Sequence, residues 1–262
     1  MLILCNGTFK SGSSWLHAIV LEICKIHQLE LANIPLRYSL NINSPTRIIE
    51  KRLHQFIRDE DFSSNHFLTK SHYFSADTFN QRYPDSVYFL FIQRDIKDAL
   101  VSHYFHFLTY RKLTISFRTY FKYIGVYKVY EMILFNRRCQ AYSGNAFNIS
   151  YKDLKLNFTE SVNNISLFLG FSKLSKHDII AIENKTSLDY MREKSKKEES
   201  KYYPELGNSS YKLFRKGEIG QWKEYLDKSS LRIIEEMNNG NASLRIRLGY
   251  YLFFILRRRI GL

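Results

Sequence analysis

Cysteine, proline and glycine are all scarce in this chain of 262 residues, which contains three, four and 11 of them. Cys5, Cys24 and Cys139 are too few and too widely spaced for a disulfide framework or a metal-binding motif. They are best explained as buried thiols in a reducing compartment, so we expect a cytoplasmic protein. The low proline and glycine content excludes long flexible linkers and low-complexity tracts.

Long apolar runs and acidic residues are also in short supply. No apolar run reaches the roughly 20 residues that a membrane-spanning helix needs, and the N-terminus does not have the pattern of a signal peptide. The 25 acidic residues face 39 lysines and arginines, which gives a net charge of +14. This surplus indicates anionic partners such as nucleotide phosphates, nucleic acid or a membrane surface, or simply a solvated basic surface.

Short apolar runs alternate with segments of helical periodicity along the chain. This alternation predicts an α/β fold with a doubly wound, mostly parallel central sheet flanked by helices. We expect one domain over residues 1–242 and a basic, hydrophobic tail helix over 243–262. The predicted strands are 2–5, 67–69, 87–92 and 146–150. The predicted helices are 16–28, 47–57, 79–83, 96–108, 116–142, 158–169 and 175–184.

The segment TFKSGSSW at residues 8–15 lies between the first predicted strand and the first predicted helix. A small-residue loop lets backbone N–H groups converge, and a helix N-terminus carries a partial positive charge, so this segment predicts an anion site. Lys10 adds a full charge. The order differs from a Walker A motif, in which Gly-Lys-Ser/Thr supplies a hydroxyl for magnesium. We therefore predict a nucleotide-phosphate site that works without a metal.

Other polar groups follow predicted strands, where a doubly wound fold places its active groups. His72 comes two residues after Lys70, and Arg94 is followed eight residues later by Ser102, so these last two could hold a phosphate between them. Tyr151 follows the last predicted strand. Taken alone, His72 also fits a structural or surface histidine, and Arg94 also fits an ordinary surface arginine.

Together these motifs resemble those of the sulfotransferases that use 3′-phosphoadenosine 5′-phosphosulfate (PAPS), in particular the cytosolic type. FKSGSSW resembles that family's 5′-phosphosulfate loop, and TKSH at 69–72 resembles its catalytic Lys-x-His. QRDIKDALVSHYFHF at 93–107 resembles its 3′-phosphate segment, and YKDL at 151–154 its adenine-side motif. RKG at 215–217 resembles its C-terminal loop, so the likeness runs in the family's order from residue 2 to about 226.

The resemblance implies a P-loop-like fold, PAPS as cofactor, PAP as product and no metal. It implies transfer of the sulfuryl group to a hydroxyl of a small alcohol or phenol, a lipid or a saccharide, by in-line displacement. His72 would be the general base, and the other catalytic groups would be Lys10, Lys70 and Ser102. The implied cofactor-binding residues are Lys10, Ser11, Gly12, Ser13, Ser14, Trp15, Arg94, Ser102, Tyr151, Thr186, Phe214, Arg215, Lys216 and Gly217.

Two other classes of protein fit parts of the sequence. A P-loop kinase is disfavoured because the Gly-Lys-Ser/Thr motif is missing. A nucleic-acid-binding module is disfavoured because its aromatic and basic residues should interleave on one strand face, whereas here the cations follow separate strands. We therefore expect no nucleic-acid partner.

The segment 244–262 combines an apolar run with five arginines. Its apolar part is too short to span a bilayer. It fits a helix that lies peripherally on an anionic membrane, at the inner face if the protein is cytoplasmic. It equally fits a last helix that packs on the domain or on a second subunit in a homodimer.

Overall fold

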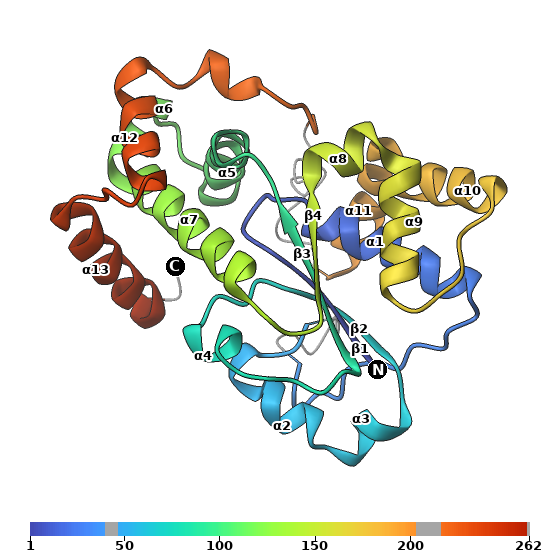
Figure 1. Cartoon of the computed structure of the whole chain (residues 1–262). Helices are drawn as coiled ribbons and strands as arrows, with labels where there is room; N and C mark the ends of the chain where they lie inside the picture. The colour runs from blue at the N-terminus through green and yellow to red at the C-terminus, as the bar shows by residue number, and fades with distance from the viewer. Residues whose placement is uncertain (40–46, 203–215, 261–262) are drawn as a thin grey trace. The chain divides into compact units, whose positions relative to one another are not determined.

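The computed structural model describes residues 1–39, 47–202 and 216–260, with the side chains of all but 197–202 and 254–260. Contacts within the chain divide it into two units. The first comprises Met1–Arg94 and Arg138–Gly217, and the second comprises Asp95–Arg137 and Glu218–Leu262. Figure 1 labels the helices and strands of both.

The first unit is built on a four-stranded parallel sheet with the strand order β2-β1-β3-β4. β1 (Leu2–Gly7) lies between β2 (Phe67–Ser71) and β3 (Val87–Gln93), and it is buried along its whole length. β4 (Ala146–Ser150) completes the sheet beside β3. All strands run in one direction, so their carboxyl ends meet at one edge, and the predicted α/β class is confirmed.

Helices α1, α8, α9 and α10 cover one face of this sheet. Ile3, Cys5, Leu90 and Ile92 point to this face and join a core of apolar residues from all four helices. Each buried leucine or isoleucine contributes about 1.5–3 kcal/mol relative to an exposed one. The helices span Ser13–Ile26 (α1), Tyr151–Leu156 (α8), Phe158–Phe168 (α9) and Lys176–Thr186 (α10), and α11 follows at Leu188–Tyr202.

The opposite face of the sheet is packed with aromatic rings. Phe89 and Phe91 contact Tyr142 at centroid distances of 5.1 and 5.7 Å, and Phe91 stacks on Phe79 at 5.6 Å. The prediction of one helix over 47–57 is only partly right, because a 3-10 turn, η1, precedes a short helix there. The elements of this region are η1 (Glu50–Arg52), α2 (Leu53–Ile57), α3 (Glu60–Ser64) and α4 (Ala76–Phe79).

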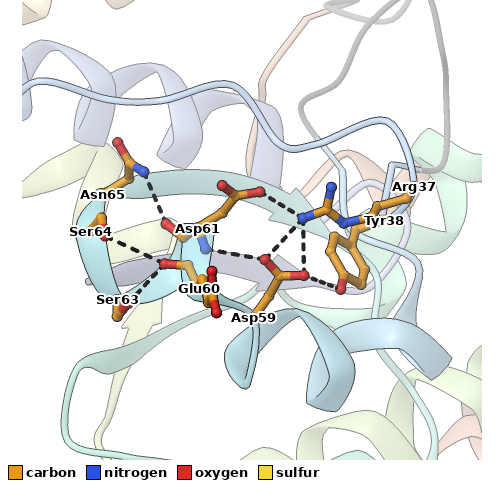
Figure 2. Close-up of polar contacts among 8 residues, drawn as sticks. All are labelled: Arg37, Tyr38, Asp59, Glu60, Asp61, Ser63, Ser64 and Asn65. Atoms are coloured by element: carbon orange, nitrogen blue, oxygen red, sulfur yellow. Dashed lines mark hydrogen bonds and ion pairs between the residues drawn. The ribbon is translucent and has the colours of Figure 1, made fainter.

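A polar network fixes the chain between α2 and α3 (Figure 2). The Arg37 guanidinium donates to Asp59 at 2.9 Å and to Asp61 at 2.7 Å, while the Tyr38 hydroxyl donates to Asp59 at 2.5 Å. These hydrogen bonds lower the pKa of Asp59, with the Tyr38 hydroxyl as the largest cause. The network therefore holds residues 37–38 against the start of α3.

The second unit is helical. Asp95 caps α5 by accepting hydrogen bonds from the backbone of Lys97 at 2.8 Å and Asp98 at 3.3 Å. The helix predicted over 116–142 is present, but a π-helical turn, η2, interrupts it where Gly125 packs against Tyr120. The elements are α5 (Ile96–Arg111), α6 (Phe117–Tyr120), η2 (Phe121–Gly125), α7 (Val126–Ala141), η4 (Gln221–Glu224), α12 (Lys228–Asn238) and α13 (Leu244–Ile260).

The final helix, α13, lies within the predicted tail and packs on α7. Phe253 stacks on Tyr127 at a centroid distance of 5.7 Å, and Tyr250 meets Tyr130 edge-on at 5.3 Å. Across the described ranges, no helix combines the length and apolar character that crossing a bilayer requires.

Candidate active site

The loop between β1 and α1 forms the centre of the candidate site. Lys10 and Gly12 both adopt left-handed backbone conformations, with φ of 64° and 103°. The buried Ser11 side chain donates a hydrogen bond to the Thr8 carbonyl at 2.8 Å and so closes the turn. A Cβ at Gly12 would lie 2.7 Å from the Tyr151 ring, so glycine is required both for φ and for space. The amides of Trp15 and Leu16 donate to the Gly12 carbonyl at 2.9 and 3.0 Å. The amides of Ser13 and Ser14 come before this first turn, at the end of a helix that attracts an anion.

Lys70 ties the end of β2 to this loop. Its ammonium group donates to the Ser14 hydroxyl at 2.8 Å. Lys70 belongs to β2 and Ser14 to α1, so the sheet places a second cation beside the helix N-terminus that already carries Lys10. The arrangement suits a group with several negatively charged oxygens.

His72 lies just beyond β2 and is fixed by the end of β1. Its Nδ1 is 2.6 Å from the Gly7 carbonyl oxygen, and its ring stacks on Phe9 at a centroid distance of 5.2 Å. A carbonyl oxygen can only accept, so Nδ1 carries the proton and Nε2 carries the lone pair. Burial lowers the pKa of His72 to about 3, assisted by Lys70, Arg47 and Lys10 and opposed by the bond to Gly7. The imidazole is therefore neutral near pH 7 and able to accept a proton at Nε2.

Arg94, just after β3, joins the loop to Tyr151. Its guanidinium lies 4.4 Å from the centroid of the Tyr151 ring and donates to the Lys10 carbonyl at 3.4 Å. The Tyr151 hydroxyl donates to the Gly217 carbonyl at 3.2 Å, and Lys155 donates to the same oxygen. These contacts bring Lys10, His72, Arg94 and Tyr151 together at the carboxyl edge of the sheet.

The remaining predicted site residues make fewer contacts with the loop or lie away from it. Trp15 meets the Tyr151 ring edge-on at 5.6 Å, whereas the hydroxyl of the buried Thr186 donates to the Ile182 carbonyl in its own helix. Ser13 is buried and Lys216 is exposed. Ser102 lies on α5 in the second unit and is half-buried. Phe214 and Arg215 lie outside the described residues.

Several charged and polar groups near the loop lie outside the motifs of the sequence. His17 lies one turn after Ser14 on α1, and burial together with Lys70, Lys194 and Arg47 lowers its pKa to about 3. The helical spacing from Ser14 could have drawn attention to His17, but no local pattern connects Arg47 or Lys194 to the loop. Among the described residues, no three His, Cys, Asp or Glu side chains are grouped so that they could hold a metal ion.

Asp98 is another buried polar residue to which no sequence pattern pointed. It is 3% exposed and accepts hydrogen bonds from the backbone of Gly220 at 2.8 Å and Trp222 at 3.2 Å. Lys97 lies over the Trp222 ring at 4.1 Å. The first turn of α5 therefore fixes the backbone of the segment that follows residue 217.

The sequence of the chain is similar to those of known sulfotransferases. Residues 2–244 match the family described as the sulfotransferase domain. The chain is 24% identical to zebrafish (Danio rerio) sulfotransferase 6B1 over 176 residues, 63% of this chain and 56% of that protein. It is 25% identical to flavonol 3-sulfotransferase of Flaveria bidentis over 248 residues, 87% of this chain and 77% of that protein. The match to sulfotransferase 6B1 thus spans little more than half of that protein's length.

Solved structures share the fold. Mouse sulfotransferase SULT7A1 complexed with PAP superposes with a TM-score of 0.64 at 19% identity, covering 97% of this chain and 88% of that one. Retinol dehydratase in a complex with retinol and PAP gives a TM-score of 0.62 at 17% identity, covering 93% of this chain and 81% of that one. Nothing in these comparisons supports a kinase or a nucleic-acid-binding module.

Proposed function

Because the chain belongs to the sulfotransferase domain family, we propose that it transfers the sulfuryl group of PAPS to a hydroxyl of an acceptor. The observation that carries the proposal is the convergence of a neutral histidine, two lysines and a helix N-terminus at one edge of the sheet. PAPS supplies the sulfuryl group and leaves as PAP.

His72 is the general base in this proposal. Its Nδ1–H bond to Gly7 directs the lone pair of Nε2 away from β1, where it takes the proton of the acceptor hydroxyl. A correctly placed general base accelerates such a reaction by roughly 10²–10⁴-fold.

The loop and the lysines beside it stabilise the negative charge of PAPS and of the transition state. The amides of residues 11–14 bind the 5′-phosphate, and Lys10 stabilises the negative charge that develops on the oxygen leaving sulfur. Lys70, held by Ser14 at 2.8 Å, supports the transferring group. Like phosphoryl transfer, this chemistry asks a protein mainly for positioning and charge neutralisation.

The 3′-phosphate of PAPS is assigned to Arg94, together with Ser102, Arg215 and Lys216. Arg94 is well suited because its guanidinium, which lies over the Tyr151 ring at 4.4 Å, offers a planar fork of donors. The adenine is assigned to Trp15, Tyr151, Thr186 and Phe214.

Location and partners are part of the proposal. Cys5, Cys24 and Cys139 are all buried free thiols, which supports a reducing compartment, so we place the enzyme in the cytoplasm. The acceptor bears a hydroxyl, and the basic surface favours an acceptor or a membrane that carries negative charge.

The test is incubation of the protein with radiolabelled PAPS and a panel of hydroxyl acceptors, with His72→Ala as the variant. We expect transfer by the natural chain, transfer abolished in His72→Ala, and binding of PAP to both within a few-fold. Near-normal turnover in His72→Ala would remove His72 from the role of base. If the natural chain fails to bind PAP in calorimetry, the proposed function is wrong.

A further inference from the structure

Over residues 244–253, the last helix of the second unit, α13, has two apolar faces, one packed on α7 and one exposed. Gly249, Tyr250 and Phe253 fall within about 100° of one another around the helix, and all three meet α7. A Cβ at Gly249 would lie 2.5 Å from the Tyr127 hydroxyl oxygen, so glycine allows the close approach of the two helices. The stacked pair Phe253–Tyr127 and the edge-on pair Tyr250–Tyr130 complete this contact.

The outward face is apolar and exposed. Leu244 is 70% exposed, Leu248 55%, Tyr251 64% and Leu252 59%. These four residues also fall within about 100° of one another, on the side opposite to Gly249 and Phe253. A row of exposed apolar residues on one helix face marks an interaction site more often than scattered single residues do.

The borders of this outward face are basic. Arg245 and Arg247 lie at its two edges by helical spacing, and both are exposed. Arg247 is held by the end of the preceding turn, since its guanidinium donates to the Ala242 carbonyl at 2.9 Å. Residues 257–259 are three further arginines, and residues 244–262 contain no aspartate or glutamate.

Exposed apolar residues bordered by arginines indicate which kind of partner binds this face. A second copy of the chain would bring the same arginines toward one another, with no carboxylate on the helix to neutralise them. An anionic bilayer surface suits both features, because apolar side chains enter the boundary of the acyl chains while arginines reach the headgroups. The apolar stretch of the helix is too short to cross the membrane, and the helix is long enough to lie on it.

We propose that α13 docks flat on a bilayer that carries anionic phospholipids, through the face formed by Leu244, Leu248, Tyr251 and Leu252. The inward face stays on α7, so docking needs no unfolding of the second unit. The proposal does not depend on the chemistry at His72, and it brings the protein to a surface on which a lipid acceptor or a membrane-bound saccharide would be found.

The test is co-sedimentation of the full chain with phosphatidylcholine vesicles that contain or lack phosphatidylserine. The variant carries Leu248→Ser, Tyr251→Ser and Leu252→Ser. The matched control carries Leu156→Ser and Leu167→Ser, which replace leucines of similar exposure, 62% and 53%, on other helices. Thermal unfolding and PAP binding establish that each variant is folded.

We expect the natural chain and the control to bind the phosphatidylserine vesicles, and the triple variant to bind at least about tenfold more weakly. Arg245→Gln should weaken vesicle binding more at low salt than at high salt, because salt screens the contribution of the arginine charge. Equal sedimentation of the triple variant and the natural chain would overturn the proposal, as would binding that does not depend on phosphatidylserine. A dimer in solution that the triple variant abolishes would also overturn it in favour of a second copy.

Discussion

The most informative prediction concerns the protonation of His72 with and without PAP. In the free protein, burial and the cations Lys70, Arg47 and Lys10 lower the pKa of His72 to about 3. A base that weak would remove a proton from a hydroxyl poorly. Bound PAP adds negative charge to the loop, and this charge stabilises the protonated imidazole, so the pKa should rise.

The size of the rise follows from the position of His72 against the loop. His72 contacts Gly7 at 2.6 Å and Phe9 at 5.2 Å between ring centroids, so an anion on the following amides lies on the order of 8 Å away. At an effective dielectric constant of about 20, one unit charge at that distance contributes about 2 kcal/mol. This corresponds to a rise of about 1.5 pH units.

The assay is a pH titration of the histidine ring signals by two-dimensional NMR, with His72→Gln to assign the signal. We expect the pKa of His72 to be far below 6 in the free protein and to rise by at least one unit in saturating PAP. Lys70 and Arg47 also lower the pKa of His17, so the pKa of His17 should rise as well when PAP binds. An ordinary histidine pKa without ligand, or a pKa that falls when PAP binds, would refute the electrostatic account of the site.

Three further predictions concern neighbouring residues. Arg94→Ala should weaken PAP binding by about 1.5–3 kcal/mol and should weaken the binding of adenosine 5′-phosphate much less. Calorimetry measures both affinities, with Lys152→Ala as the control. Equal losses for the two nucleotides would contradict the 3′-phosphate assignment. Gly12→Ala should lower the free energy of unfolding by at least about 1–2 kcal/mol, because φ is 103° and Tyr151 blocks the Cβ; an unchanged urea midpoint would contradict this. Asp98→Ala leaves two backbone donors unpaired and should cost about 2–4 kcal/mol in the same assay, whereas replacing the exposed Asp189 should cost almost nothing.

The sequence by itself determined the class of fold and the place of the candidate site residues along the chain. Apolar runs and helical periodicity are local properties, so they located the strands and the helices that follow them. Parallel strands share one edge for their carboxyl ends, and this rule alone placed Lys10, His72, Arg94 and Tyr151 together. The 3-10 turn at Glu50–Arg52 and the π-helical turn at Phe121–Gly125 were missed, because the spacing of apolar residues does not distinguish such turns from a regular α-helix.

The tertiary structure decided which atoms of these residues meet. The proton on His72 Nδ1 is set by the Gly7 carbonyl, 65 positions away in the sequence, and Tyr151 receives its stacking partner Arg94 only through the pairing of β3 with β4. The approach of Arg47 to His72 and the covering of one face of α13 by α7 are equally non-local. Periodicity reveals that a helix has apolar faces, but only the packed chain shows which of those faces already has a partner.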